Sequence, residues 1–145
     1  MTTMRELAPG ETALAFAALR ELRPHLTDED AFLRRVDELQ RSEGYRVVAA
    51  FDAGSREASA AAGFRIGHNL AWGRFLYVDD LSTLPGARRR GHACRLLAWL
   101  ADEARRAGCE SLHLDSGVGP ERQHAHWLYF ATGMRIGSYH FSRAV

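Results

Sequence analysis

The sequence predicts an α/β domain with a mixed, mostly antiparallel central sheet, one splayed parallel pair of strands and about four flanking helices. Three observations lead to this class. Two amphipathic helical patterns follow a short N-terminal strand, three strand patterns joined by short polar loops come next, and helices alternate with strands in the last third. The 145 residues suit one core and no linker or repeat divides them, so residues 1–145 are expected to form one domain.

Composition narrows the class of protein. The 19 basic and 18 acidic residues nearly cancel, which argues against general nucleic-acid binding. No apolar run approaches the roughly 20 residues that span a bilayer, and the N-terminus MTTMRELAPGET lacks a signal-peptide pattern, so no membrane partner is expected. The two cysteines, Cys94 and Cys109, lie in or beside one predicted helix. Such sparse cysteine use favours a reduced, cytoplasmic setting.

The first third predicts a strand and two helices. A strand over Met4–Leu7 is broken by Pro9-Gly10, and apolar residues at helical spacing predict a helix over residues 11–22 that Pro24 ends. Thr27 is the predicted N-cap of the second helix, with acidic residues in its first turn. That helix carries apolar residues at Phe32, Leu33, Val36 and Leu39.

The middle of the chain predicts an antiparallel meander. Strand patterns cover residues 45–51, 58–66 and 72–83, and short polar loops join them. A long amphipathic helix is expected to begin near Arg89, with Gly108 as its C′ residue, and a strand follows over Ser111–Asp115. A strand–helix–strand unit of this length implies that its two strands are parallel. A helix over residues 121–132 and a last strand over residues 134–141 complete the prediction.

The junction between the third meander strand and the long helix predicts an anion site. Arg88, Arg89 and Arg90 precede Gly91, His92 and Ala93 at the start of the helix. Free N–H groups, the positive end of the helix dipole and three guanidiniums therefore meet at one point, and such a point binds phosphate.

Two motifs in this order resemble the GCN5-related N-acetyltransferase family. Arg88-x-x-Gly91-x-Ala93 resembles the family's coenzyme-A signature, Gln/Arg-x-x-Gly-x-Gly/Ala, and it stands in the right place after a strand. The segment Ala125-His126-Trp127-Leu128-Tyr129-Phe130-Ala131-Thr132-Gly133-Met134 resembles the family's A-x-x-x-Y-x-x-x-G-F/M ending. The resemblance covers essentially the whole chain and implies the fold of that family.

The resemblance implies acetyl-CoA as co-substrate. The pyrophosphate would lie on the turn, where Gly91 and Ala93 allow close approach to the backbone. The pantetheine amides would pair with the strand backbone at Leu81, Ser82 and Thr83, and Leu81 N–H would polarise the thioester carbonyl. Cys94 lies on the helix near the coenzyme and is expected to be a small buried residue. Arg122 stands where the family often has an Asn that contacts the pantetheine arm, so either Gln123 or Ser116 takes over this contact or the arm is held differently.

The implied reaction is direct attack of a primary amine on the thioester, in a ternary complex without a covalent enzyme intermediate. Tyr129 matches the family's general-acid tyrosine. An amine must also lose a proton, and Asp79, Asp80 and Asp115 are the candidate bases, among which the sequence does not choose. The acceptor amine, a small molecule or a peptide, is not specified by any motif.

Three alternatives accompany this hypothesis. The chain could hold acetyl-CoA without transferring it, as a sensor or interaction domain. A nucleic-acid module that uses the arginine run is disfavoured by the balanced charge. A metal site built on His113, His124, His126 or His140 lacks ligand spacing, so no metal is expected. A homodimer is compatible with the resemblance, because family members are often dimers, but no residue specifies one.

Overall fold

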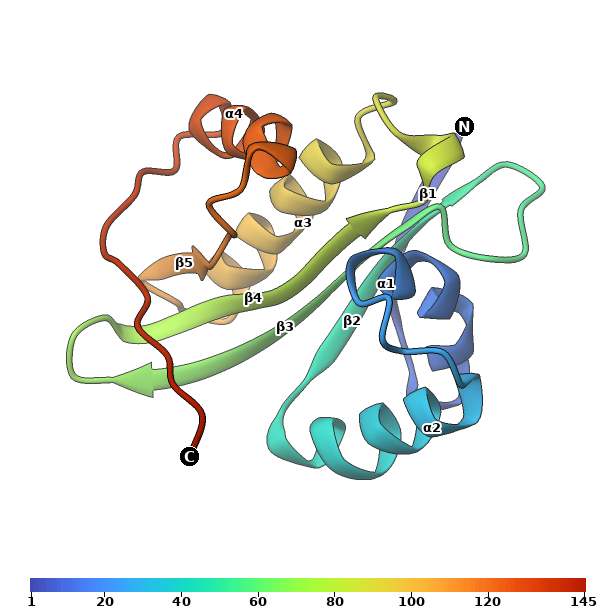
Figure 1. Ribbon diagram of the computed structural model, residues 1–145, viewed down its shortest axis with the longest axis horizontal. Coiled ribbons are helices and arrows are strands. Elements are labelled where there is room, and N and C mark those ends of the chain that lie inside the picture. Colours follow the sequence, from blue (N-terminus) through green and yellow to red (C-terminus); the bar gives the residue numbers. More distant parts are fainter. The chain divides into compact units, whose positions relative to one another are not determined.

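The structure is a computed structural model that describes all 145 residues. The chain forms two compact units, Met1–His113 and Leu114–Val145, and each is described by itself. A five-stranded sheet of order β1-β2-β3-β4-β5 organises the fold (Figure 1). Its strands are β1 (Thr2–Leu7), β2 (Arg46–Asp52), β3 (Ala60–Asn69), β4 (Gly73–Thr83) and β5 (Ser111–Leu114).

The sheet has the predicted mixture of directions. β1 pairs antiparallel with β2, β2 with β3, and β3 with β4. β5 is reached through α3 (His92–Arg106) and forms the one parallel pair, with β4. The predicted meander and crossover unit are therefore confirmed, and so is the mixed α/β class.

Helices cover both faces of the sheet in the N-terminal unit. The register pairs Phe64 with Val78, and Phe64 packs edge-on against Trp99 of α3. The next pair, Gly63 and Asp80, points to the opposite face, where Asp80 contacts Arg23 at the end of α1 (Phe16–Leu22). Figure 1 shows α1 and α2 (Glu29–Arg34) on one side of the strands and α3 on the other. The sheet is thus buried between two helical layers.

The first helical segments are less regular than predicted. Residues 11–22 do not form one helix, because a 3₁₀ segment η1 (Pro9–Ala15) precedes α1. Helix α2 begins at Glu29, and its N-cap is Asp28, whose side chain accepts a hydrogen bond from Asp30 N–H at 3.0 Å. The prediction of Thr27 as N-cap was wrong by one residue, since either side chain can cap and only Asp28 reaches the N–H group. A π-helical turn η2 (Arg35–Gln40) and a 3₁₀ turn η3 (Arg41–Glu43) continue the segment.

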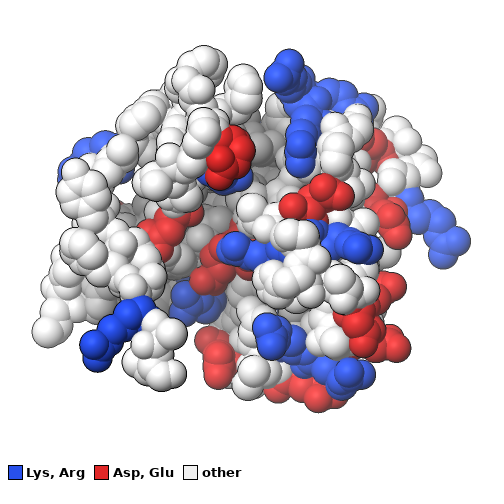
Figure 2. Space-filling view, viewed as in Figure 1, with Lys and Arg blue, Asp and Glu red and all other residues white.

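The surface of α1 and α2 carries charged side chains of both signs and has no patch of a single sign. Figure 2 shows acidic and basic residues interspersed over α1 and α2. Several are paired, including Asp37 with Arg41 at 2.9 Å. None of the helices combines the length and the apolar character that crossing a bilayer requires.

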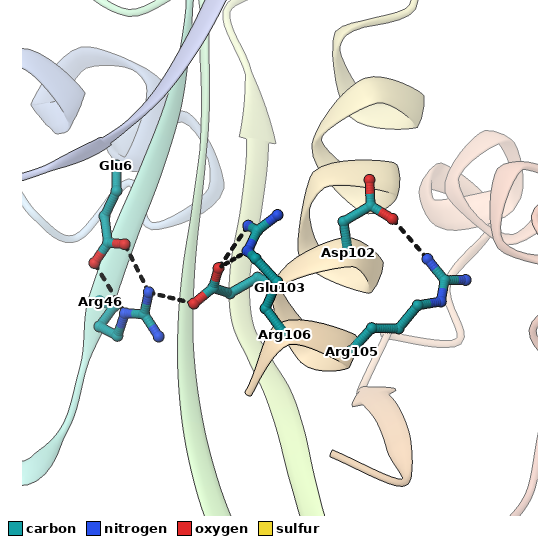
Figure 3. A network of polar contacts seen from close by, with 6 residues as sticks. All are labelled: Glu6, Arg46, Asp102, Glu103, Arg105 and Arg106. Carbon is teal, nitrogen blue, oxygen red and sulfur yellow. Dashed lines mark hydrogen bonds and ion pairs between the residues drawn. The ribbon is translucent and has the colours of Figure 1, made fainter. Parts of the chain in front are cut away.

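Helix α3 begins later than predicted and is anchored to the sheet by charge. Its first residue is His92, after a 3₁₀ turn η4 (Pro85–Ala87) and an irregular turn, and Gly108 follows its end with φ +74° as predicted. Glu103 of α3 accepts hydrogen bonds from Arg46 of β2 at 2.7 Å and from Arg106 at 2.6 Å (Figure 3). Arg46 also reaches Glu6 of β1 at 2.6 Å, so one network joins two strands to the helix.

The C-terminal unit contains a short 3₁₀ turn η5 (Pro120–Arg122) and α4 (Gln123–Ala131), which confirm the predicted helix. The predicted last strand over residues 134–141 was wrong: residues 132–145 contain no strand. A strand needs a partner for its backbone groups. Within residues 134–145, one backbone–backbone hydrogen bond forms, from Met134 N–H to the Tyr129 carbonyl at 3.0 Å. The apolar side chains that follow are exposed: Ile136, Tyr139 and Phe141.

Candidate active site

The second half of β4 contains an irregularity that separates its two aspartates. Gly63 pairs with Asp80 and Phe64 pairs with Val78, so Asp79 is an extra residue, a β-bulge. Beyond the bulge Leu81, Ser82 and Thr83 pair with Ala62, Ala61 and Ala60. Near the start of β5, Glu110 N–H bonds to the Arg74 carbonyl at 2.8 Å, and β5 has only four residues. Because β5 accompanies the first half of β4, Leu81–Thr83 project beyond it.

The turn after β4 has an unusual backbone. Arg89 has φ +62° and Gly91 has φ +82°, both left-handed, and helix α3 starts directly afterwards. The helix cannot include Arg89 because of this φ, and no sequence signal reveals it, since arginine is a good helix former. The first N–H groups of α3, from His92 onward, have no partner within the helix. An ideal Cβ on Gly91 would lie 3.1 Å from Arg95 Nη1, a tight contact, and the left-handed φ would strain any side chain at this position.

The three arginines of this turn have different surroundings. Arg88 Nε donates to the Thr83 carbonyl at 3.3 Å, and Arg90 Nη2 donates to Asp52 at 2.8 Å. The Arg89 side chain has no protein partner. Cys94 is exposed rather than buried, which corrects the prediction. It lies two residues from both His92 and Leu96 on α3, and two residues turn the helix by about 200°, away from the buried face.

The carboxylates of Asp79 and Asp80 bind different side chains, although Arg23 Nη2 also donates to the Asp79 carbonyl at 3.0 Å. Both oxygens of Asp79 accept hydrogen bonds from Arg65 at 2.8 Å. Asp80 accepts from Arg23 Nε at 2.9 Å and from the Tyr45 hydroxyl at 2.7 Å. Burial raises the pKa of Tyr45 well above its usual value, and the negative charge of Asp80 adds to the effect. Tyr45 therefore acts as a neutral hydrogen-bond donor to Asp80.

An aromatic cluster lies at the other end of β4. Trp72 stacks on His113 of β5 with ring centroids 3.6 Å apart, and Phe75 meets both rings edge-on. Burial lowers the pKa of His113. His113 Nε2 lies 2.8 Å from the Ser111 hydroxyl. Packing of the three rings against one another is sufficient to explain their arrangement.

The C-terminal unit carries Tyr129 together with a polar group from the loop before α4. Burial raises the pKa of Tyr129, and the positive charge of the nearby Arg122 guanidinium opposes that rise. Arg122 ends η5 directly before α4, and Tyr129 lies on α4. Arg122 Nε also lies 3.4 Å from the Ser116 hydroxyl, and His126 Nε2 lies 3.1 Å from the same oxygen.

Asp115 and Gln123 lie in the same unit but outside this group. Asp115 contacts His140 with a distance of 3.1 Å between Oδ2 and Nδ1, and both side chains are more than half exposed. Gln123 is the exposed first residue of α4.

The sequence profile of the acetyltransferase (GNAT) family matches residues 12–134, which include β4, the turn and α4. The chain belongs to this family. This match confirms the expected resemblance. The turn at Arg88–Ala93 and Tyr129 of α4 both lie within the matched residues.

Relatives and solved structures agree with the assignment. An uncharacterized N-acetyltransferase, YhdJ of Bacillus subtilis (strain 168), is 31% identical over 147 residues and covers both chains completely. An aminoalkylphosphonate N-acetyltransferase of Salmonella typhimurium is 32% identical over 68 residues, 47% of this chain and 43% of its own.

Two crystal structures illustrate the shared fold. An aminoglycoside acetyltransferase from an uncultured soil metagenomic sample has a TM-score of 0.80 at 22% identity, covering 100% of this chain and 99% of its own. The aminoglycoside N-acetyltransferase AAC(6')-Iy in complex with CoA has a TM-score of 0.76 at 22% identity, covering 99% and 95%.

Several residues around the candidate site were not found from sequence. Arg23, Tyr45 and Arg65 bind the two β4 aspartates, and Asp52 binds the turn, but none belongs to a motif. Their roles come from contacts between residues 14 to 57 positions apart, which periodicity and local motifs do not encode. No group of three or more His, Cys, Asp or Glu side chains is arranged to hold a metal ion.

Proposed function

We propose that this GNAT protein transfers the acetyl group of acetyl-CoA to a primary amine by direct attack in a ternary complex. The observation that carries the proposal is the turn after β4 in a family member, where the left-handed Gly91, the free N–H groups of α3 and the Arg89 side chain meet. We take residues 1–145 as one catalytic domain, because the family match runs across both units.

The donor site is proposed to extend from the turn along β4. Converging N–H groups and the helix dipole suit a pyrophosphate, and Arg88, Arg89 and Arg90 add positive charge. His92, Ala93 and Cys94 form the first turn of α3 and supply further backbone N–H groups. The projecting backbone of Leu81, Ser82 and Thr83 suits the amides of the pantetheine arm, as in strand addition.

Acetyl-CoA supplies an activated acetyl thioester, and the chain's residues would handle charge and protons around it. Leu81 N–H would stabilise the negative charge that develops on the carbonyl oxygen. Tyr129 would donate its hydroxyl proton to the departing thiolate and regain one from water. Gln123 or Ser116 would contact the pantetheine arm in place of the family's Asn.

We propose Asp80 as the group that attracts the acceptor amine and receives its proton. Asp80 directly precedes Leu81, whereas both oxygens of Asp79 bind one guanidinium and Asp115 is 56% exposed. Arg23, its cationic partner, is 44% exposed and lies just after α1, so an incoming ammonium can replace it. The Tyr45 hydroxyl keeps the carboxylate oriented during that exchange.

The acceptor is proposed to be a small primary amine or a peptide amine. The partial similarity to the Salmonella typhimurium enzyme makes aminoalkylphosphonates the first compounds to test, followed by aminoglycosides and peptide N-termini. The unpaired cysteines, Cys94 and Cys109, support a reduced, cytoplasmic location.

A thiol-release assay across this panel tests the proposal. The 19 basic residues are all arginine, so the chain has no lysine and self-acetylation is confined to its N-terminus. Wild-type protein should release CoA in an acceptor-dependent manner, and Gly91→Glu should not, because bulk and charge oppose the pyrophosphate. Acetyl-CoA binding by calorimetry without turnover on any amine would instead support the sensor alternative. Absence of binding would contradict both.

A further inference from the structure

Asp52 lies beneath the donor turn, although it belongs to β2 and to no GNAT motif. It is the last residue of that strand. Its Oδ2 accepts hydrogen bonds from Ser59 Oγ and from Arg90 Nη2, both at 2.8 Å. Its Oδ1 accepts from Thr2 Oγ1 at 3.2 Å and lies 3.3 Å from His92 Nε2. The hydrogen bond from Ser59 is the main cause that lowers the pKa of Asp52, so the carboxylate is charged at neutral pH.

His92, the first residue of α3, is turned toward Asp52. The residue is only 2% exposed, and Nδ1 lies 3.3 Å from Arg95 Nη2. A guanidinium can only donate, so Nδ1 is the acceptor and the neutral ring carries its hydrogen on Nε2. That Nε2 is the one buried side-chain nitrogen or oxygen of the chain without a hydrogen bond. Asp52 is therefore its electrostatic partner, in imperfect alignment.

The backbone directly before these two contact residues is strained. Arg89 is a non-glycine residue at φ +62°, and such a conformation persists only where its surroundings enforce it. Arg95 Nη2 holds the Arg90 carbonyl at 2.9 Å from the helix side. Asp52 holds the Arg90 and His92 side chains from the sheet side. The residues on both sides of Gly91 are thus fixed by one carboxylate.

We propose that Asp52 is a positioning residue for the donor: through Arg90 and His92 it holds the turn in the shape that receives the pyrophosphate. The inference rests on the proposed function. In this proposal Arg90 anchors the turn to Asp52, whereas the Arg89 side chain is available to bind the ligand. A preorganised turn loses less entropy when the ligand binds, which strengthens binding.

Asp52→Asn separates this positioning role from a simple effect of charge, because the two predict opposite changes in the affinity for acetyl-CoA. Removal of a negative charge beside an anion site should tighten acetyl-CoA binding if only charge matters. Loss of the anchor should weaken it. We expect Kd for acetyl-CoA, measured by calorimetry, to rise about tenfold, the effect of one charge-assisted contact. KM for acetyl-CoA should rise similarly, with kcat nearly unchanged.

Asp102→Asn is the matched control, because Asp102 is an acidic residue on α3 itself that pairs with Arg105 and is 62% exposed. It should leave Kd unchanged. Ser59→Ala removes one hydrogen bond to Asp52 without changing charge, and it keeps the test decisive if Asp52→Asn does not fold. We expect about a threefold rise in Kd for this variant.

An unchanged or lower Kd in Asp52→Asn, or in Ser59→Ala where that variant alone folds, would overturn the proposal. A fall in kcat at unchanged KM would also overturn it, since a positioning residue of the donor site acts on binding. Failure of the proposed function is distinguishable, because wild-type protein would then not bind acetyl-CoA at all.

Discussion

The Tyr45 hydroxyl donates a 2.7 Å hydrogen bond to Asp80 Oδ2, and it does so directly over Gly63. An ideal Cβ on Gly63 would overlap the Tyr45 hydroxyl and ring. The absence of a side chain at Gly63 therefore allows a buried phenol to reach the β4 carboxylate. This contact joins the start of β2, the middle of β3 and the bulge of β4 at the proposed acceptor side of the site.

Gly63→Ala should destabilise the protein and disturb Asp80. The added methyl group must displace Tyr45, a buried aromatic residue, and overpacking of this kind costs about 1–3 kcal/mol. Urea denaturation measures the loss. Gly10→Ala is the control, because nothing lies within 4 Å of its Cβ position, and it should be neutral within about 0.5 kcal/mol. Equal stability of the two variants would contradict the close-approach explanation.

Asp80→Asn should lower kcat roughly a hundredfold in the thiol-release assay, the usual scale for loss of a general base. Asp79→Asn should lose less activity, because Asp79 is paired with Arg65 rather than with the Arg23–Tyr45 pair. Thermal melting of both variants separates misfolding from lost chemistry. A larger loss in Asp79→Asn, with both variants folded, would reverse the assignment.

Tyr129→Phe should lower kcat with little change in KM for acetyl-CoA, since only the proton donor is removed. Unchanged turnover would show that Tyr129 is not the general acid.

Arg122→Gln should raise the pKa of Tyr129 further. Burial raises that pKa and the Arg122 guanidinium counteracts it, so removal of the guanidinium leaves burial unopposed. Ultraviolet difference titration of the phenols, with Tyr129→Phe as the reference that identifies the signal, measures the shift. A lower pKa in Arg122→Gln would contradict the interaction of these two side chains.

Arg46→Met should cost about 1–2 kcal/mol of stability at pH 7, because it removes the cation shared by Glu6 and Glu103 but keeps the apolar stem over the Phe64 ring (Figure 3). The exposed Asp102–Arg105 pair in the same figure provides the control: Arg105→Met should change stability by less than about 0.5 kcal/mol. Urea denaturation of both variants measures the difference.

The stabilisation that the network of Glu6, Arg46 and Glu103 gives to the folded protein should also depend on pH. Burial raises the pKa of Glu103, but hydrogen bonds from Arg46 and Arg106 outweigh that effect and lower it below the usual 4.5. A carboxylate with a lowered pKa in the folded state stabilises the protein above its unfolded pKa and loses that effect as the pH falls through the folded value. The difference between wild type and Arg46→Met should therefore shrink below about pH 4.5. A constant difference down to pH 3 would contradict this origin.

Sequence patterns predicted those parts of the molecule that depend on neighbouring residues. Sequence predicted the strand–turn–helix unit around Arg88–Ala93 and the helix that carries Tyr129, because each motif is an uninterrupted run of residues. The left-handed conformation of Arg89 could not be predicted, because arginine itself prefers a helix and the contacts that fix the next residue, Arg90, come from the distant Asp52 and from Arg95. The missing last strand is a similar case: residues 134–141 have strand-like composition, but only a partner strand would make them one.

The central claim is that the chain transfers acetyl groups from acetyl-CoA to primary amines. The most direct measurement is CoA release from acetyl-CoA by wild-type protein, with and without each amine of the panel, beside Gly91→Glu. The account predicts acceptor-dependent release by wild type, mass-spectrometric detection of the acetylated amine, and no activity in Gly91→Glu. Calorimetric binding of acetyl-CoA without release on any amine, or no binding at all, would contradict it.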